Sequence, residues 1–173
     1  MTGSQLQEET SAPASSLGSI IGRLASVIAS DNFPSGERAA LKRLTPGAPS
    51  PLSFYRFAFR YLPENWENNK LAWGTVVAGL ALMHPHPHRP DRPAGRALAE
   101  SGYPEARLER LLEAEGDVLH TLLLRAVRFL AAKGESVNWT DFARLLMSID
   151  PAKREAASLQ IARSYYRNLK EKE

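Results

Sequence analysis

The sequence contains no cysteine, and this absence excludes several kinds of site. Disulfide bonds, thiolate zinc sites, iron–sulfur clusters and thiol nucleophiles all need a cysteine sulfur. The phosphate-binding patterns GxxxxGK[ST] and GxGxxG and the nucleophile pattern GxSxG are missing too. Because no convergent catalytic set remains, we predict no catalytic residues, no enzyme activity and no cofactor.

Long apolar runs are also missing. The longest candidate, residues 71–83, contains Gly74 and Gly79 and is shorter than the roughly 18 to 20 residues that cross a bilayer. The N-terminus carries Glu8 and Glu9 where a secretory signal would carry Lys or Arg. We therefore expect a cytoplasmic protein without membrane contact.

Strand patterns are absent as well, since β-branched and polar residues nowhere alternate over a strand length. Apolar residues recur at helical spacing instead, which predicts an all-α fold of two small helical bundles. The 173 residues divide into a polar, disordered leader (1–15), an N-terminal bundle (16–84), a Pro/His-rich linker (85–93) and a C-terminal bundle (94–173).

The final predicted helix begins at Asp150-Pro151, an N-cap followed by a proline suited to the first turn. At about 100° per residue, one of its arcs is basic and the other apolar. The basic arc holds Lys153, Gln160, Arg163 and Arg167, and the arc predicted to pack holds Leu159, Ile161, Tyr165, Tyr166 and Leu169.

Three histidines at alternate positions, His84, His86 and His88, raise the question of a metal site near Asp91. Alternate side chains of an extended segment do not converge on one tetrahedral ion, and no cysteine completes the set. We predict no metal and an exposed loop without an apolar anchor.

Five aromatic residues interleave with Arg56 and Arg60 in the third predicted helix. Base stacking is conceivable for such rings, but helices of this kind usually bury them, so we predict core packing. These residues are Phe54, Tyr55, Phe57, Phe59 and Tyr61.

Positive charge is clustered although the net charge is only +3. Residues 35–62 hold five Lys or Arg against a single acidic residue, Glu37, and residues 117–173 hold ten against seven. Phosphate recognition needs only cationic side chains at the spacing of the backbone, without a base-reading motif. The distribution favours sequence-independent binding of nucleic acid.

Several segments, in order and spacing, resemble the small CasB subunit of the type I-E CRISPR Cascade surveillance complex. They are residues 52–56 (LSFYR), 66–68 (WEN), 95–102 (GRALAESG), 143–146 (ARLL) and 153–154 (KR). The resemblance spans about residues 17–168. It implies an all-α, non-enzymatic subunit that holds the RNA-guided assembly together, binds the displaced DNA strand and stabilises the R-loop. The implied partners are other Cascade subunits, guide RNA, single-stranded and target DNA, and a second copy in a head-to-tail dimer.

The predicted nucleic-acid-binding residues come from two sources. The resemblance supplies Lys42, Arg43, Arg56, Arg96, Arg107, Arg128, Lys153 and Arg154. Helical basic stripes add Arg38, Arg125, Arg163 and Arg167. For Arg96 the alternative is a structural role that joins the two bundles.

Two other classes of function stay open on the sequence alone. A helical transcription regulator would discriminate strongly between duplex sequences. A protein-only scaffold would use its basic faces on acidic protein partners and would ignore nucleic acid.

Overall fold

The computed structural model describes residues 16–169, and the predicted leader (1–15) lies outside this range. The helices are α1 (Leu17–Ala29), α2 (Ser35–Lys42), α3 (Leu52–Tyr61), the short 3-10 helix η1 (Trp66–Asn69), α4 (Lys70–Leu82), α5 (Ala94–Glu100), α6 (Glu105–Glu113), α7 (Gly116–Ala132), α8 (Trp139–Met147) and α9 (Pro151–Asn168). No strand occurs between residues 16 and 169, which confirms the all-α prediction. No helix in this range is both long and apolar enough to traverse a bilayer.

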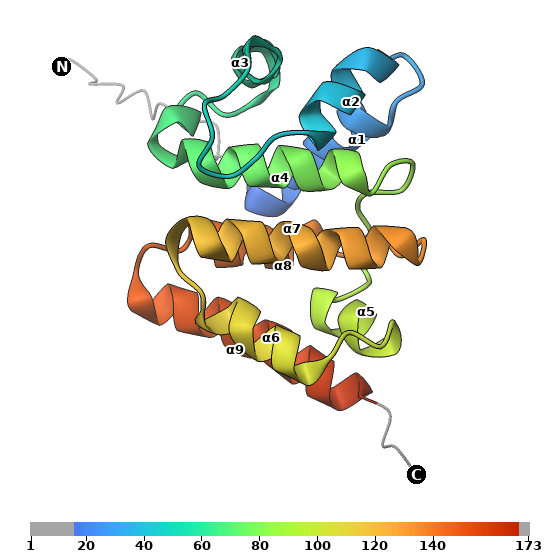
Figure 1. The fold of residues 1–173 in the computed structure, drawn as a ribbon, viewed down its shortest axis with the longest axis vertical. Helices are drawn as coiled ribbons and strands as arrows, with labels where there is room; N and C mark the ends of the chain where they lie inside the picture. Colours follow the sequence, from blue (N-terminus) through green and yellow to red (C-terminus); the bar gives the residue numbers. More distant parts are fainter. Residues whose placement is uncertain (1–15, 170–173) are drawn as a thin grey trace, which may run out of the picture.

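Helices α4 and α7 lie side by side across the middle of the molecule (Figure 1). Helices α1 to α3 lie on the α4 side, and α5, α6 and α9 lie beyond α7. The buried side chains form one hydrophobic cluster with members from before and after residues 85–93. The division into two bundles at this segment therefore stays a prediction.

Helix α4 is apolar around most of its circumference because neighbours enclose it on several sides. Gly79 allows the closest approach, since a Cβ added there would lie 2.1 Å from the ring of Trp139 on α8. The Trp139 indole N–H donates to the Met83 sulfur at 3.2 Å. The prediction that Trp139 is a packing residue at a helix start is confirmed, with Asn138 as the N-cap.

The Pro/His-rich segment is docked, which corrects the expectation of an exposed loop without an anchor. Pro87 is buried, and the Arg89 N–H donates to the Val137 carbonyl at 2.8 Å. The Trp139 backbone N–H donates to His88 Nδ1 at 3.0 Å. Burial lowers the pKa of His88, so the neutral, hydrogen-bond-accepting ring is favoured.

Helix α9 begins as predicted, with Asp150 accepting from the Ala152 N–H and Pro151 in the first turn. The predicted packing arc is only partly correct. Ile161 and Tyr165 are buried, but Leu159, Tyr166 and Leu169 are exposed. The buried stripe is narrow because α9 lies at the surface and packs mainly against α5 and α8.

Candidate nucleic-acid interface

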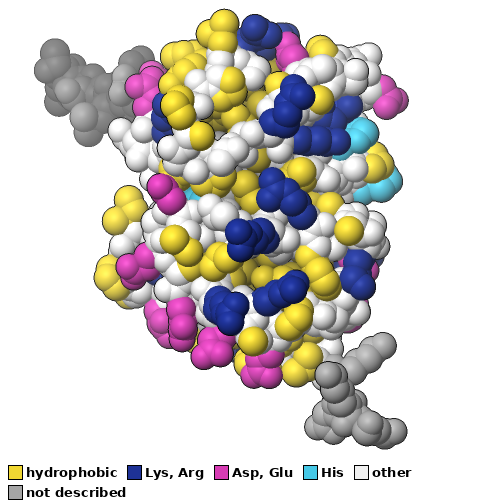
Figure 2. Space-filling model, in the orientation of Figure 1, with side chains coloured by type: hydrophobic (Ala, Val, Ile, Leu, Met, Phe, Trp, Pro, Cys, Tyr) yellow, Lys and Arg dark blue, Asp and Glu magenta, His cyan; other side chains and the backbone are white. Residues whose placement is uncertain are grey.

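Exposed or half-exposed cationic side chains follow one another over three helices on one face of the molecule. Figure 2 shows this as dark blue side chains over α2, α7 and α6. We call this set the basic row. We take its members to be six exposed or half-exposed side chains of these helices: Lys42 and Arg43 at the end of α2, Arg125 and Arg128 on α7, and Arg107 and Arg110 on α6.

Helical spacing places the charges of α7 and α6 on this surface. On α7 most of the circumference is buried, and Arg125 and Arg128, three residues apart, occupy the exposed strip that remains. On α6 the buried residues are Leu108 and Leu111, while Arg107 and Arg110 are exposed. The amphipathic pattern of each helix therefore fixes which side its arginines take.

The basic row keeps its positive charge. None of its six members forms an ion pair within residues 16–169. The carboxylates of α6, Glu105, Glu109 and Glu113, are four residues apart and form their own stripe beside that of the arginines, and none of them forms an ion pair with Arg107 or Arg110. A surface with one sign of charge attracts a polyanion and accelerates its association.

Arg38 and Arg154, both predicted to bind nucleic acid, serve helix ends. The Arg38 guanidinium donates to the carbonyls of Ile28 and Ser30, at 2.9 and 3.0 Å, where α1 ends. The Arg154 guanidinium donates to the carbonyls of Leu112 and Ala114, at 3.1 and 2.9 Å, where α6 ends. Terminal helix carbonyls lack partners within the helix, so both arginines satisfy acceptors of the fold.

Arg56 and Arg96, also predicted to bind nucleic acid, have carboxylate partners. Arg56 lies 3.4 Å from Glu37, and Arg96 donates to Glu100 on its own helix at 2.8 Å. The hydrogen bond from Arg96 lowers the pKa of Glu100, which therefore stays ionised. The Glu100 carboxylate also lies 3.2 Å from Arg92.

The predicted residues of α9 belong to a helix outside the basic row, although α9 contacts α6 through Arg154 and Tyr166. Lys153, Arg163 and Arg167 are exposed, as the sequence predicts. Helix α9 packs mainly against α5 and α8, whereas the basic row runs over α2, α7 and α6. Five of the predicted residues, Lys42, Arg43, Arg107, Arg125 and Arg128, are thus members of the basic row, whereas Arg38, Arg56, Arg96 and Arg154 have partners within the fold.

One member of the basic row, Arg110, was missing from the sequence prediction. Its signal is the spacing, because Arg110 follows Arg107 by one helical turn. The aromatic prediction also needs a correction. Phe54 and Phe57 are buried, but Phe59 is 72% exposed and meets Trp66 only at its edge, with ring centroids 5.5 Å apart.

The described part of the chain contains no set of side chains that could bind a metal ion. No three His, Asp or Glu side chains there lie close enough to share an ion. His84 and His86 therefore lack the further ligands that a site would need.

Fold and surface define the class as a small, all-α protein with a basic face. The family model for CRISPR-associated protein Cse2 matches residues 37–166. The chain belongs to the Cse2 (CasB) family, and the resemblance drawn from the sequence is confirmed. Among curated proteins, none matches the chain. Family membership implies a structural subunit of a CRISPR Cascade complex, with other Cascade subunits as partners. The family is not known as an enzyme family.

Proposed function

We propose that the basic row binds the sugar–phosphate backbone of nucleic acid without sequence preference. The observation that carries the proposal is the basic row, six exposed or half-exposed Lys and Arg from both halves of the chain that form no ion pair within residues 16–169. Each phosphate contact releases condensed counterions, so binding is strong at low salt and independent of sequence. In RNA-guided complexes base pairing reads the sequence, and protein supplies contacts to the backbone.

Within Cascade, the proposed role is to bind guide RNA and the displaced strand of target DNA and so stabilise the R-loop. R-loop formation is nearly balanced energetically, because one duplex replaces another of similar stability. A cationic surface that binds the displaced single strand tips this balance toward the open state. No catalytic step is needed for this role.

The proposal includes a head-to-tail contact with a second copy. Large apolar side chains are exposed on helices far apart in the molecule, Leu52 and Phe59 on α3 and Leu159 and Tyr166 on α9. A head-to-tail contact joins unlike surfaces of successive copies, and burial of these side chains would favour it.

The experiment measures how single-stranded DNA binding depends on salt. The purified chain is titrated into a labelled oligonucleotide between 50 and 200 mM salt, and the slope of log affinity against log salt is determined. Each phosphate contact contributes about 0.7 to this slope for single strands. Arg125→Ala with Arg128→Ala should reduce it by about 1.4, and Lys42→Ala with Arg43→Ala should do the same.

Other outcomes identify the other classes of function. An unchanged slope in both double variants would remove the basic row from the interface. Strong preference for one duplex sequence would indicate a transcription regulator. A chain that ignores nucleic acid, alone and within Cascade, would indicate a protein-only scaffold.

A further inference from the structure

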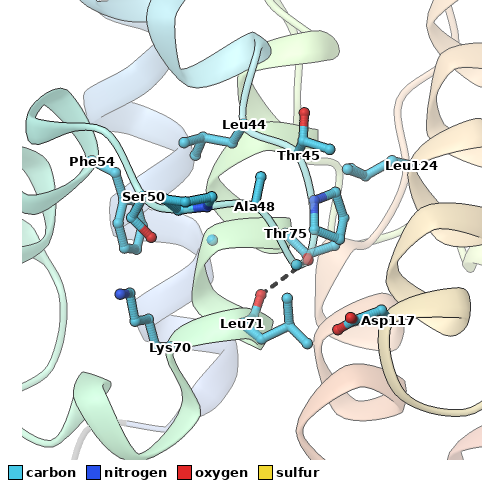
Figure 3. Close-up of a pocket in the computed structure, with 14 residues that line it drawn as sticks. Leu44, Thr45, Ala48, Ser50, Phe54, Lys70, Leu71, Thr75, Asp117 and Leu124 are labelled. Atoms are coloured by element: carbon cyan, nitrogen blue, oxygen red, sulfur yellow. Dashed lines mark hydrogen bonds between the residues drawn. The ribbon is translucent and has the colours of Figure 1, made fainter.

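A cavity of about 300 Å³ opens between the segment of residues 44–50, helices α3 and α4, and the first half of α7 (Figure 3). This volume lies at the lower end of the range for small-molecule sites. The cavity adjoins the basic row in the chain, because Leu44 follows Arg43 and Leu124 precedes Arg125. The basic row and the cavity therefore have neighbouring residues at the end of α2 and in the middle of α7.

The wall formed by residues 44–50 contains a hydrogen-bonded turn. Residues 45–48 make a type II turn, with Pro46 in its second position and Gly47 in its third at φ +82°. The Ala48 N–H closes the turn on the Thr45 carbonyl at 3.1 Å. Because this turn is already formed, binding of a ligand would cost little conformational entropy in the wall.

The turn also packs tightly against α7. A Cβ added at Gly47 would lie 2.8 Å from Oδ2 of Asp117, so the glycine lets the backbone approach this carboxylate. Asp117 takes part in none of the ion pairs within residues 16–169. An acceptor without a cationic partner is thereby held at one side of the cavity.

The lining combines an apolar wall with one carboxylate, Asp117, and one cation, Lys70, whose ammonium donates to the Tyr55 hydroxyl at 2.6 Å. Its apolar part includes Pro49, Phe54 and Leu71, which suit the faces and edges of a planar ring. Lys70 and Asp117 lie on opposite sides of the cavity in Figure 3. The Asp117 carboxylate accepts hydrogen bonds only and repels phosphate, whereas the amino groups of cytosine, adenine and guanine are donors.

We propose that this cavity binds one unstacked nucleobase of the single strand that the basic row holds, with Asp117 accepting from the exocyclic amino group. This inference rests on the proposed function. Bases in a displaced strand have already lost their pairing partner, so turning one base out of the strand is cheapest there. Thymine has no exocyclic amino group and therefore cannot donate this hydrogen bond to Asp117.

The test compares three single-stranded oligonucleotides on the full chain at one salt concentration: oligo-dC, oligo-dT, and oligo-dC with abasic positions. We expect oligo-dC to bind at least about five-fold more tightly than the other two, a difference typical of one well-placed base contact. Asp117→Leu, which has a similar branched shape but no hydrogen-bond acceptor, should remove most of the preference for dC over dT.

A variant that fills the cavity separates this inference from the proposed function. Ala48 is exposed at the rim, so Ala48→Trp can fold normally and occupy the opening. Asn32→Trp adds the same ring at an exposed position outside the cavity lining and serves as the control. Ala48→Trp should abolish the preference for dC over the abasic strand, and Asn32→Trp should retain it.

Equal binding of all three oligonucleotides would overturn the nucleobase site. If the slope of log affinity against log salt still depended on Arg125 and Arg128, the proposed function would stand. A preference that survives Ala48→Trp would also overturn the site. Loss of all nucleic-acid binding by the native chain would overturn both.

Discussion

Arginine serves two regions of this molecule in different ways. At the ends of α1 and α6, Arg38 and Arg154 point inward and donate to backbone carbonyls. On the face formed by α2, α7 and α6, the arginines of the basic row are exposed and have no ion-pair partner within residues 16–169. The same side chain thus stabilises the fold in one region and is available to a polyanion in the other.

The difference shows that a basic residue cannot be assigned from charge alone. A guanidinium that already donates to carbonyls has lost donors for phosphate, and removing it leaves acceptors of the fold unsatisfied. An exposed guanidinium without a partner contributes little to stability. Stability and salt-dependent binding should therefore respond to different sets of substitutions.

The largest expected effect on stability is that of Arg154→Ala. This change leaves the carbonyls of Leu112 and Ala114 without their donor, and each hydrogen bond from a charged group contributes about 1.5 to 3 kcal/mol. Partial access of water offsets part of the loss, so the free energy of unfolding should fall by about 3 kcal/mol in urea titrations. The slope of DNA affinity against salt should stay the same.

Arg154→Lys is the matched control. A lysine keeps the charge but lacks the planar fork that reaches both carbonyls, so its unfolding free energy should lie between those of wild type and Arg154→Ala. Arg38→Ala repeats the comparison at the end of α1. Normal stability together with a reduced salt slope would place Arg154 among the phosphate-binding residues instead.

A smaller effect is expected from pH at His120, which is buried between α4 and α7. Its Nδ1 atom forms a hydrogen bond of 2.7 Å with the Thr75 hydroxyl, whose oxygen also lies 3.0 Å from the Leu71 carbonyl oxygen. Burial lowers the pKa of His120 from its usual 6.5, although the Asp117 carboxylate opposes the shift.

The sign of the pH effect follows from this shift. Above pH 6.5 the ring is neutral in both states and its contribution to stability is complete. As the pH falls below that value the unfolded chain takes up a proton first, so the free energy of unfolding decreases until the pH reaches the lowered pKa. Urea titrations at pH 7.5 and 5.5 should show a smaller difference for His120→Gln than for wild type. An equal difference would contradict a lowered pKa.

The smallest effect is expected from Arg163→Ala with Arg167→Ala on α9. These side chains are exposed and lie outside the basic row, so unfolding free energy should change by less than about 0.5 kcal/mol. The salt slope for single-stranded DNA should stay close to that of wild type. A slope reduced as much as in the Arg125 and Arg128 variant would extend the interface to α9.

Much of the local structure could be predicted because its causes are local. The start of α9 follows from Asp150 and Pro151, and the helix of residues 94–100 ends before Gly102, which has φ +80°. The arc of α9 that packs could not be predicted. Its buried stripe depends on how closely α5 approaches, and Gly95 allows that approach, since a Cβ there would lie 2.1 Å from the Ile161 carbonyl oxygen.

The sequence by itself determined the helices, the family and the exposure of most basic residues, because helical periodicity and capping act within a few residues of the chain. Only the tertiary structure decided which of those residues share a face. It packed α2 on α4, α4 on α7 and α7 on α6, turned Arg38 and Arg154 toward carbonyls at helix ends, and held Gly47 against Asp117 to wall a cavity. Contacts between residues far apart in the chain depend on how helices pack, and no local pattern encodes that packing.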